Sequence, residues 1–192
     1  DKKIYAEASL NCLNKLDKTI DEMPFSLNPG LAVKEVMVDS SPASYTIDRH
    51  MIIVSKPGGL KSGASTNITF RYEGSLEEGF CYPWHNEDIR EDYFAIGPLR
   101  INKNQLILKD DYLLLTPETY WYPVAGLNFY PDNPAKINVD FTNYSLKVRR
   151  NNDLVAISQG ERSSDDSYWY FNNTSPLTGI SLIEGRYLSD TI

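Results

Sequence analysis

Few residues of this chain have side chains that could catalyse a reaction or bind a metal. It has two histidines, His50 and His85, and two cysteines, Cys12 and Cys81, in 192 residues. A catalytic zinc site needs closely spaced histidines and a carboxylate, and neither an H-E-x-x-H nor a C-x-x-C sequence occurs. A cysteine nucleophile at Cys81 with His85 as base is conceivable, but such pairs normally come from separate segments of the chain. The sequence therefore indicates no catalytic residue and no metal site.

The acidic residues offer no better candidate for catalysis. Most lie in adjacent pairs beside turns, and adjacent residues of a strand face opposite sides, so they cannot converge on one substrate or ion. These pairs are Glu77-Glu78, Glu87-Asp88, Glu91-Asp92, Asp110-Asp111 and Asp165-Asp166. We interpret them as solvated loop charges.

Two readings of the cysteines remain open. Cys12 and Cys81 can form one disulfide in an oxidising compartment, whereas Cys12 alternates with Ala6, Ala8 and Leu10 and fits a small core residue. We favour the second reading.

Composition restricts the class of partner. The net charge is -7 and the sequence pI is about 4.9, which disfavours binding to a nucleic-acid backbone or an anionic lipid surface. No apolar run reaches the roughly 18 residues of a membrane-spanning helix. We expect no nucleic-acid partner and no direct membrane insertion by this segment. The length of 192 residues predicts a single β domain, residues 1–192. Because the chain starts without methionine, we expect this domain to be excised from a longer protein.

Apolar residues recur with a period of two, which predicts an all-β fold, either a β-sandwich or antiparallel sheets layered in a saddle-like form. Asn, Gly, Pro, Asp and Ser clusters separate the runs, and no amphipathic helix of three turns is indicated. Residues 77–97 lack a stable period and predict a loop. The expected strands are 4–13, 25–27, 31–33, 36–38, 45–47, 51–54, 68–72, 106–108, 112–115, 137–148, 154–158, 168–171 and 179–188.

An aromatic corner is the main functional candidate. A strand-like run ending at Leu115 enters a Thr-Pro-Glu turn that contains Glu118. Three aromatic residues follow, and a proline then ends the element. They are Tyr120, Trp121, Tyr122 and Pro123. A bulky corner of this kind favours packing or an interdomain contact over an isolated ligand site.

A second hypothesis comes from the supply of aromatic side chains. Thirteen tyrosines and three tryptophans in an all-β domain could form a sugar-stacking platform. In a carbohydrate-binding or adhesion module the stacking residues would be Tyr82, Trp84 and Trp169.

Several segments, taken in order, resemble the N-terminal β domain of the zinc aminopeptidase N family, which includes aminopeptidase N and leukotriene hydrolase. An apolar strand ending in Tyr-x-Gly is similar to residues 68–74, and an aromatic-Pro corner before a long strand is similar to residues 121–148. A Phe-x-x-Thr-x-Pro run and a Gly-aromatic end look like residues 171–176 and 185–187. The sequence Leu-Thr-Pro-Glu-x-x-Trp-Tyr-Pro looks most like the bacterial branch of this family, in which an aminopeptidase-like region is joined to an ABC-transporter permease.

This resemblance implies a non-catalytic domain that packs against a metallopeptidase domain of the same parent chain and helps shape its cleft. It implies no cofactor in this chain, zinc in a following domain if the parent is active, a peptide as a possible ligand and an extracytoplasmic location. In the family, a carboxylate or amide of this domain holds the peptide amino terminus. Glu118 is the polar residue at the corner, although it does not fall at the family's offset.

Overall fold

The structure, a computed structural model, describes residues 3–81, 106–126, 140–151 and 153–187. The described part contains β-strands, two short 3₁₀ helices and no α-helix, as the all-β prediction requires. None of its helices is long and apolar enough to cross a bilayer. Two compact units emerge, one built mainly from residues 3–77 and 120–139, the other from residues 78–119 and 140–192. A single functional domain stays a prediction.

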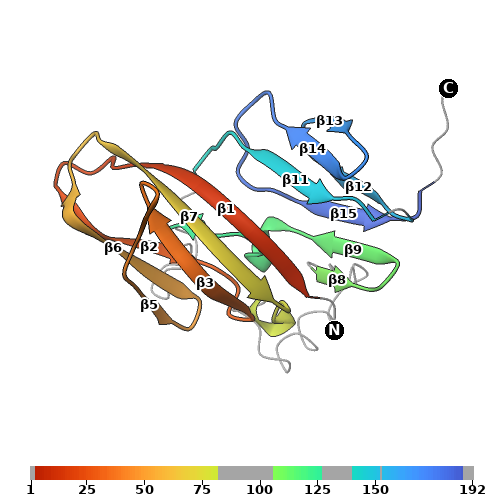
Figure 1. The fold of residues 1–192 in the computed structure, drawn as a ribbon, viewed down its shortest axis with the longest axis horizontal. Coiled ribbons are helices and arrows are strands. Elements are labelled where there is room, and N and C mark those ends of the chain that lie inside the picture. Colours follow the sequence, from red (N-terminus) through yellow and green to blue (C-terminus); the bar gives the residue numbers. More distant parts are fainter. Residues whose placement is uncertain (1–2, 82–105, 127–139, 152, 188–192) are drawn as a thin grey trace, which may run out of the picture. The chain divides into compact units, whose positions relative to one another are not determined.

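The first unit contains two antiparallel sheets of four strands each (Figure 1). One sheet has the order β1-β7-β3-β4 and the other the order β10-β2-β6-β5. The strands are β1 (Ile4–Leu13), β2 (Ile20–Ser26), β3 (Leu31–Val38), β4 (Ser41–Pro42), β5 (Tyr45–Asp48), β6 (Met51–Leu60), β7 (Ser65–Gly74) and β10 (Val124–Ala125).

An apolar core joins the two sheets of the first unit. Phe25 of β2 and Phe70 of β7 are almost completely buried and meet edge to face, with ring centroids 5.0 Å apart. Burial of each ring contributes about 2–3 kcal/mol to the free energy of unfolding. The alternation that predicted strands therefore supplies the inward faces of a sandwich.

Strand β1 alternates as the sequence predicted. The side chains of Ala6, Ala8, Leu10 and Cys12 share the less exposed face. Burial raises the pKa of the Cys12 thiol to about 11, so it is protonated at neutral pH. Cys12 makes no disulfide with any side chain that the structure describes, and the side chain of Cys81 lies outside that description.

The second unit also contains two antiparallel sheets. Their orders are β11-β14-β13 and β12-β15-β9-β8. The strands are β8 (Leu106–Leu108), β9 (Tyr112–Leu115), β11 (Ser145–Arg149), β12 (Val155–Ser158), β13 (Glu161–Ser164), β14 (Tyr168–Asn172) and β15 (Leu182–Gly185), and the 3₁₀ helices are η1 (Glu78–Cys81) and η2 (Pro117–Thr119). The hairpin expected at residues 106–115 is confirmed as the pair β8–β9.

The strand expected at residues 137–148 is confirmed at residues 145–148 and wrong at residues 140–144. Only Ser145–Arg149 pairs as a strand, and residues 137–139 lie outside the described residues. Thr142 instead forms an isolated bridge with Leu177, and the side-chain oxygen of Asn173 accepts the Tyr144 N–H at 2.7 Å. These local bonds satisfy the backbone groups that a longer strand would have paired.

Other boundaries also differ from the sequence expectation. The runs expected at residues 31–33 and 36–38 form one strand with an irregularity between Val33 and Glu35, and the last strand is limited to Leu182–Gly185. Strand β13 was not predicted because all four of its side chains are exposed and carry no apolar alternation. In the expected loop 77–97, Glu78–Cys81 forms η1, and residues 82–97 lie outside the described residues.

We predict that Asp39 makes the stability of the first unit depend on acid pH. Its carboxylate accepts bonds from Lys56, Thr66 and the Asn67 N–H, and these lower its pKa to about 2. A carboxyl whose pKa falls on folding stabilises the protein above the unfolded-state value, and this contribution disappears as the pH drops through about 2. Asp39→Asn should therefore lower the denaturation midpoint at pH 7 and flatten its decline between about pH 4 and 2. The exposed Asp17→Asn is the control, and equal profiles for the two variants would contradict the prediction.

Candidate functional site

The aromatic corner begins as a 3₁₀ turn in the second unit. Thr119 is fully buried, its hydroxyl donates to the Thr116 carbonyl at 2.8 Å, and its N–H donates to the same oxygen at 3.1 Å. Pro117 suits the first position of such a turn because its ring fixes φ. The turn leaves the Glu118 side chain exposed.

Hydrogen bonds of the first unit fix the main chain of the next residues. The Asn28 N–H donates to the Tyr120 carbonyl at 2.9 Å, and the Tyr72 hydroxyl donates to the Trp121 carbonyl at 3.2 Å. Tyr120 has φ of 51°, a left-handed conformation that costs a bulky residue of the order of 1 kcal/mol. After Pro123 the chain does not stop but pairs with β2 as β10.

The side chains of the corner divide into buried and accessible ones. Trp121 is 6% exposed and Pro123 is fully buried, whereas Tyr120 and Tyr122 are half-buried. The Trp121 and Tyr122 rings meet edge to face with centroids 5.0 Å apart. Only Glu118, Tyr120 and Tyr122 therefore offer side-chain surface to a partner, while Trp121 and Pro123 serve packing. The predicted role of the corner as an interdomain or cleft contact stays a prediction.

Tyr72 acts here as a neutral donor. Burial raises its pKa well above the ordinary tyrosine range, and the nearby Tyr122 adds to that shift. The phenol therefore stays protonated under all physiological conditions, and its O–H can donate to the Trp121 carbonyl throughout.

Asn28 organises the backbone on the inner side of the corner. Its side chain is fully buried, and its oxygen accepts the Gly30 N–H at 3.0 Å and the Glu77 N–H at 2.8 Å. Its amide nitrogen donates to the Glu77 carbonyl at 3.2 Å. One side chain thus joins the β2–β3 turn to the segment after β7, and the same residue's main chain holds Tyr120. From the sequence, Asn28 is only one residue of the Asn-Pro-Gly cluster that separates the expected strands 25–27 and 31–33, because its distant partners are about fifty and ninety residues away.

Two glycines permit this close approach. A Cβ atom on Gly30 would lie 2.0 Å from the Ser75 carbonyl oxygen, and one on Gly74 would lie 2.2 Å from the Gly30 carbonyl oxygen. Such distances are sterically impossible, so β3 and β7 can come together here only with glycine at both positions.

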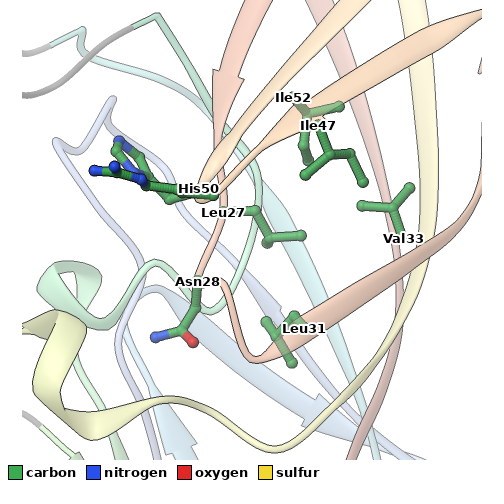
Figure 2. A pocket seen from close by; sticks show the side chains of 8 residues that line it. Leu27, Asn28, Leu31, Val33, Ile47, His50 and Ile52 are labelled. Atoms are coloured by element: carbon green, nitrogen blue, oxygen red, sulfur yellow. The ribbon is translucent and has the colours of Figure 1, made fainter.

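A small hollow lies beside the Asn28 turn. Its apolar wall comes from Leu27, Leu31, Val33, Ile47 and Ile52, and Figure 2 shows these side chains clustered. Its polar rim consists of Asn28, Arg49 and His50. Burial lowers the pKa of His50, which keeps the imidazole largely neutral at pH 7. No serine, threonine, cysteine, lysine or carboxylate lines the hollow.

The described residues provide no group of three or more His, Cys, Asp or Glu side chains that could hold a metal ion. His85, the other histidine of the sequence, lies outside them. The residues that the structure describes therefore do not fit a zinc site, and we assign no chemistry that requires one to this chain.

Of the three residues in the sugar-binding hypothesis, only Trp169 is described. Tyr82 and Trp84 lie outside the described residues. The guanidinium carbon of Arg150 lies 4.7 Å from the centre of the Trp169 ring, and that of Arg162 lies 5.3 Å from it. The indole Nε1 is buried and has no hydrogen-bond partner in the described part of the chain. Two guanidinium groups therefore already contact this ring, and a sugar that stacked on it would have to displace them.

The chain has the fold of the N-terminal region of M1 zinc metallopeptidases. A two-domain M1 zinc metallopeptidase bound to L-arginine matches with a TM-score of 0.66 and 13% identity, over 95% of this chain and 38% of the other. The M1 zinc metallopeptidase of Deinococcus radiodurans matches with a TM-score of 0.63 and 12% identity, again over 95% of this chain and 38% of the other. Yeast LTA4 hydrolase in complex with bestatin matches with a TM-score of 0.61 and 14% identity, over 98% of this chain and 27% of the other. No family profile and no curated protein matches the sequence.

These comparisons concern part of each metallopeptidase. The chain spans well under half of the length of the structures that it resembles. At such low identity the likeness establishes the fold, and it does not by itself transfer activity, substrate or partners to this chain.

We predict that Tyr72→Phe weakens the first unit through the corner alone. The ring packing is retained, but the Trp121 carbonyl loses its buried donor, which should cost about 0.5–1.5 kcal/mol of unfolding free energy. Urea denaturation followed by tryptophan fluorescence measures this. The exposed Tyr5→Phe is the matched control, and identical midpoints for both variants would refute the role of the hydroxyl.

We expect a larger loss from Asn28→Ala. Two backbone N–H groups would lose their acceptor inside the fold, at about 1–3 kcal/mol each. The exposed Asn11→Ala is the control and should change stability by less than about 0.5 kcal/mol. A mild effect at Asn28, equal to that at Asn11, would mean that water replaces the amide at no cost.

Proposed function

We propose that this chain is the non-catalytic N-terminal β region of an M1-type metallopeptidase-like protein, in which it packs against the metallopeptidase domain and helps shape its cleft. The observation that supports this best is the fold match, which covers 95% or more of the chain in each of the three structures described above. This chain has no H-E-x-x-H sequence, and we propose that zinc, if the complete protein binds it, is held by a following domain.

The corner suits this role because its backbone is rigidly held. The carbonyls of Tyr120 and Trp121 accept hydrogen bonds from Asn28 and Tyr72, so the half-buried Tyr120 and Tyr122 are presented in a fixed geometry on the first unit. Glu118 is the exposed carboxylate on this segment, and a carboxylate can pair with the ammonium group at a peptide amino terminus. Peptide is therefore the ligand class that we propose for the complete protein.

We further propose an extracytoplasmic location and an association with an ABC-transporter permease. This part rests only on the sequence at residues 115–123, which resembles that bacterial branch. A parent that has lost its metal site and serves the transporter structurally is the competing proposal.

The test of the proposed function uses the full-length protein. We expect bound zinc, and we expect hydrolysis of aminoacyl-coumarin substrates that disappears on zinc chelation and returns on zinc addition. A full-length protein that binds no zinc and hydrolyses none of these substrates would exclude the peptidase and leave the structural role.

We predict a specific effect of Glu118→Gln on that activity. If the carboxylate holds the amino terminus of the substrate, KM should rise about tenfold, equivalent to about 1.4 kcal/mol, with kcat nearly unchanged. Asp111→Asn is the matched control, because it is another exposed carboxylate in a turn of the same unit. An unchanged KM for Glu118→Gln would remove Glu118 from the site without affecting the proposal for the domain.

A further inference from the structure

The second unit contains the three-stranded sheet β11-β14-β13 (Figure 1). Its two faces carry different side chains. Strand alternation puts Trp169 and the buried Phe171 on one face, and Tyr168, Tyr170 and Asn172 on the other. We call the second one the tyrosine face. It consists of Ser145, Lys147 and Arg149 from β11, Tyr168, Tyr170 and Asn172 from β14, and Glu161 and Ser163 from β13.

The tyrosine face is accessible. Both tyrosines are half-buried, and all the other residues of the face are exposed. The two rings lie beside each other with centroids 6.3 Å apart and planes tilted by 50°. The Tyr170 hydroxyl donates to Asp165 at 2.7 Å, and the same carboxylate accepts the Tyr168 N–H at 2.7 Å. The β13–β14 turn therefore holds the tyrosine pair in place.

The chemistry of this face suits a carbohydrate better than an apolar protein surface. None of its residues is aliphatic, whereas protein interfaces concentrate apolar side chains at their centre. Two aromatic rings can pack against the C–H groups of a sugar ring. Around the rings lie hydroxyl, amide and carboxylate groups, which can bond to sugar hydroxyls. They belong to Ser163 and Glu161, and to Ser145 and Asn172, whose Oγ and Oδ1 atoms are already hydrogen-bonded to each other at 2.6 Å.

The charges on the face are unevenly distributed. Arg149 lies opposite Tyr168, and the Lys147 ammonium group is 3.8 Å from the centre of the Tyr168 ring and 5.5 Å from that of Tyr170. Glu161 lies at the other end, opposite Asn172. Asp165 is already bonded to Tyr170 and to two backbone N–H groups. A ligand carboxylate is thus complementary to the Tyr168 end, where it would draw Lys147 off the ring and free the ring for stacking.

We propose that the tyrosine face binds a carboxylate-bearing polysaccharide, with a sugar ring on Tyr168 and Tyr170 and its carboxylate paired with Lys147 and Arg149. The proposal is independent of any peptidase activity. The net charge of -7 sharpens its test, because the chain as a whole repels such a polymer. Binding must therefore come from a local site.

The experiment is affinity electrophoresis of the full-length protein in gels that contain polygalacturonate, alginate or hyaluronan, with neutral dextran and poly-glutamate as comparison polymers. We expect at least one of the three carboxylate-bearing polysaccharides to retard the protein, and we expect no retardation by dextran or poly-glutamate. If none of the three polysaccharides retards the protein, or if dextran retards it equally, the proposal is overturned. Equal retardation by poly-glutamate would indicate that the tyrosine face binds an acidic peptide, and it would overturn the proposal of a polysaccharide ligand.

Variants locate the site. Tyr168→Ala with Tyr170→Ala should weaken binding at least tenfold, whereas the double Phe variant should keep most of it because the rings remain. Lys147→Gln with Arg149→Gln should weaken binding about fivefold and reduce its salt dependence. Tyr5→Ala, at a tyrosine of the first unit that is 71% exposed, is the control. The double Phe and double Gln variants both preserve the strands. If the double Gln variant binds as the wild type does, or if the double Phe variant no longer binds, the proposed contacts with the polysaccharide are refuted.

Discussion

The buried amide of Asn28 is the interaction on which the first unit depends most. A fully buried amide is unfavourable unless its polar atoms are bonded, and here the three side-chain bonds connect the β2–β3 turn with the segment after β7. The Asn28 N–H then fixes Tyr120, which enters the unit from a distant part of the sequence. Because each partner satisfies a group that would otherwise be buried and unpaired, the turn, the strand end and the aromatic corner must form together.

This constraint changes how the aromatic corner is understood. Bulky aromatic residues that follow a turn are expected at contact surfaces, yet Trp121 and Pro123 point their bulk inward. Their burial and the bonds to the adjacent carbonyls make the segment rigid. On the first unit, the side-chain surface that the corner leaves for recognition is small and consists of Tyr120 and Tyr122.

The strand β14 shows how one sequence run can supply two surfaces. The Tyr-Trp-Tyr-Phe run reads as uniformly aromatic, but alternation sends Trp169 and Phe171 to one face and Tyr168 and Tyr170 to the other. Arginines contact Trp169 on its face, while a lysine lies over the tyrosines on theirs. The aromatic content alone therefore does not describe either face, because each face brings its own cations to its rings.

The sequence by itself determined the class of fold and much of its strand order, because a period of two and the turn residues between the runs are local properties. It located β1, β8 and β9, and it excluded an internal H-E-x-x-H zinc site. It overextended the strand that contains Ser145–Arg149, since the bonds of Thr142 and Tyr144 that end it come from Leu177 and Asn173. It also missed β13, whose exposed side chains give no periodic signal. Only the tertiary structure decided the role of Asn28, the burial of Trp121 and the separation of the aromatic faces. Each depends on contacts between residues far apart in the chain or on opposite sides of a sheet, and no local pattern records them.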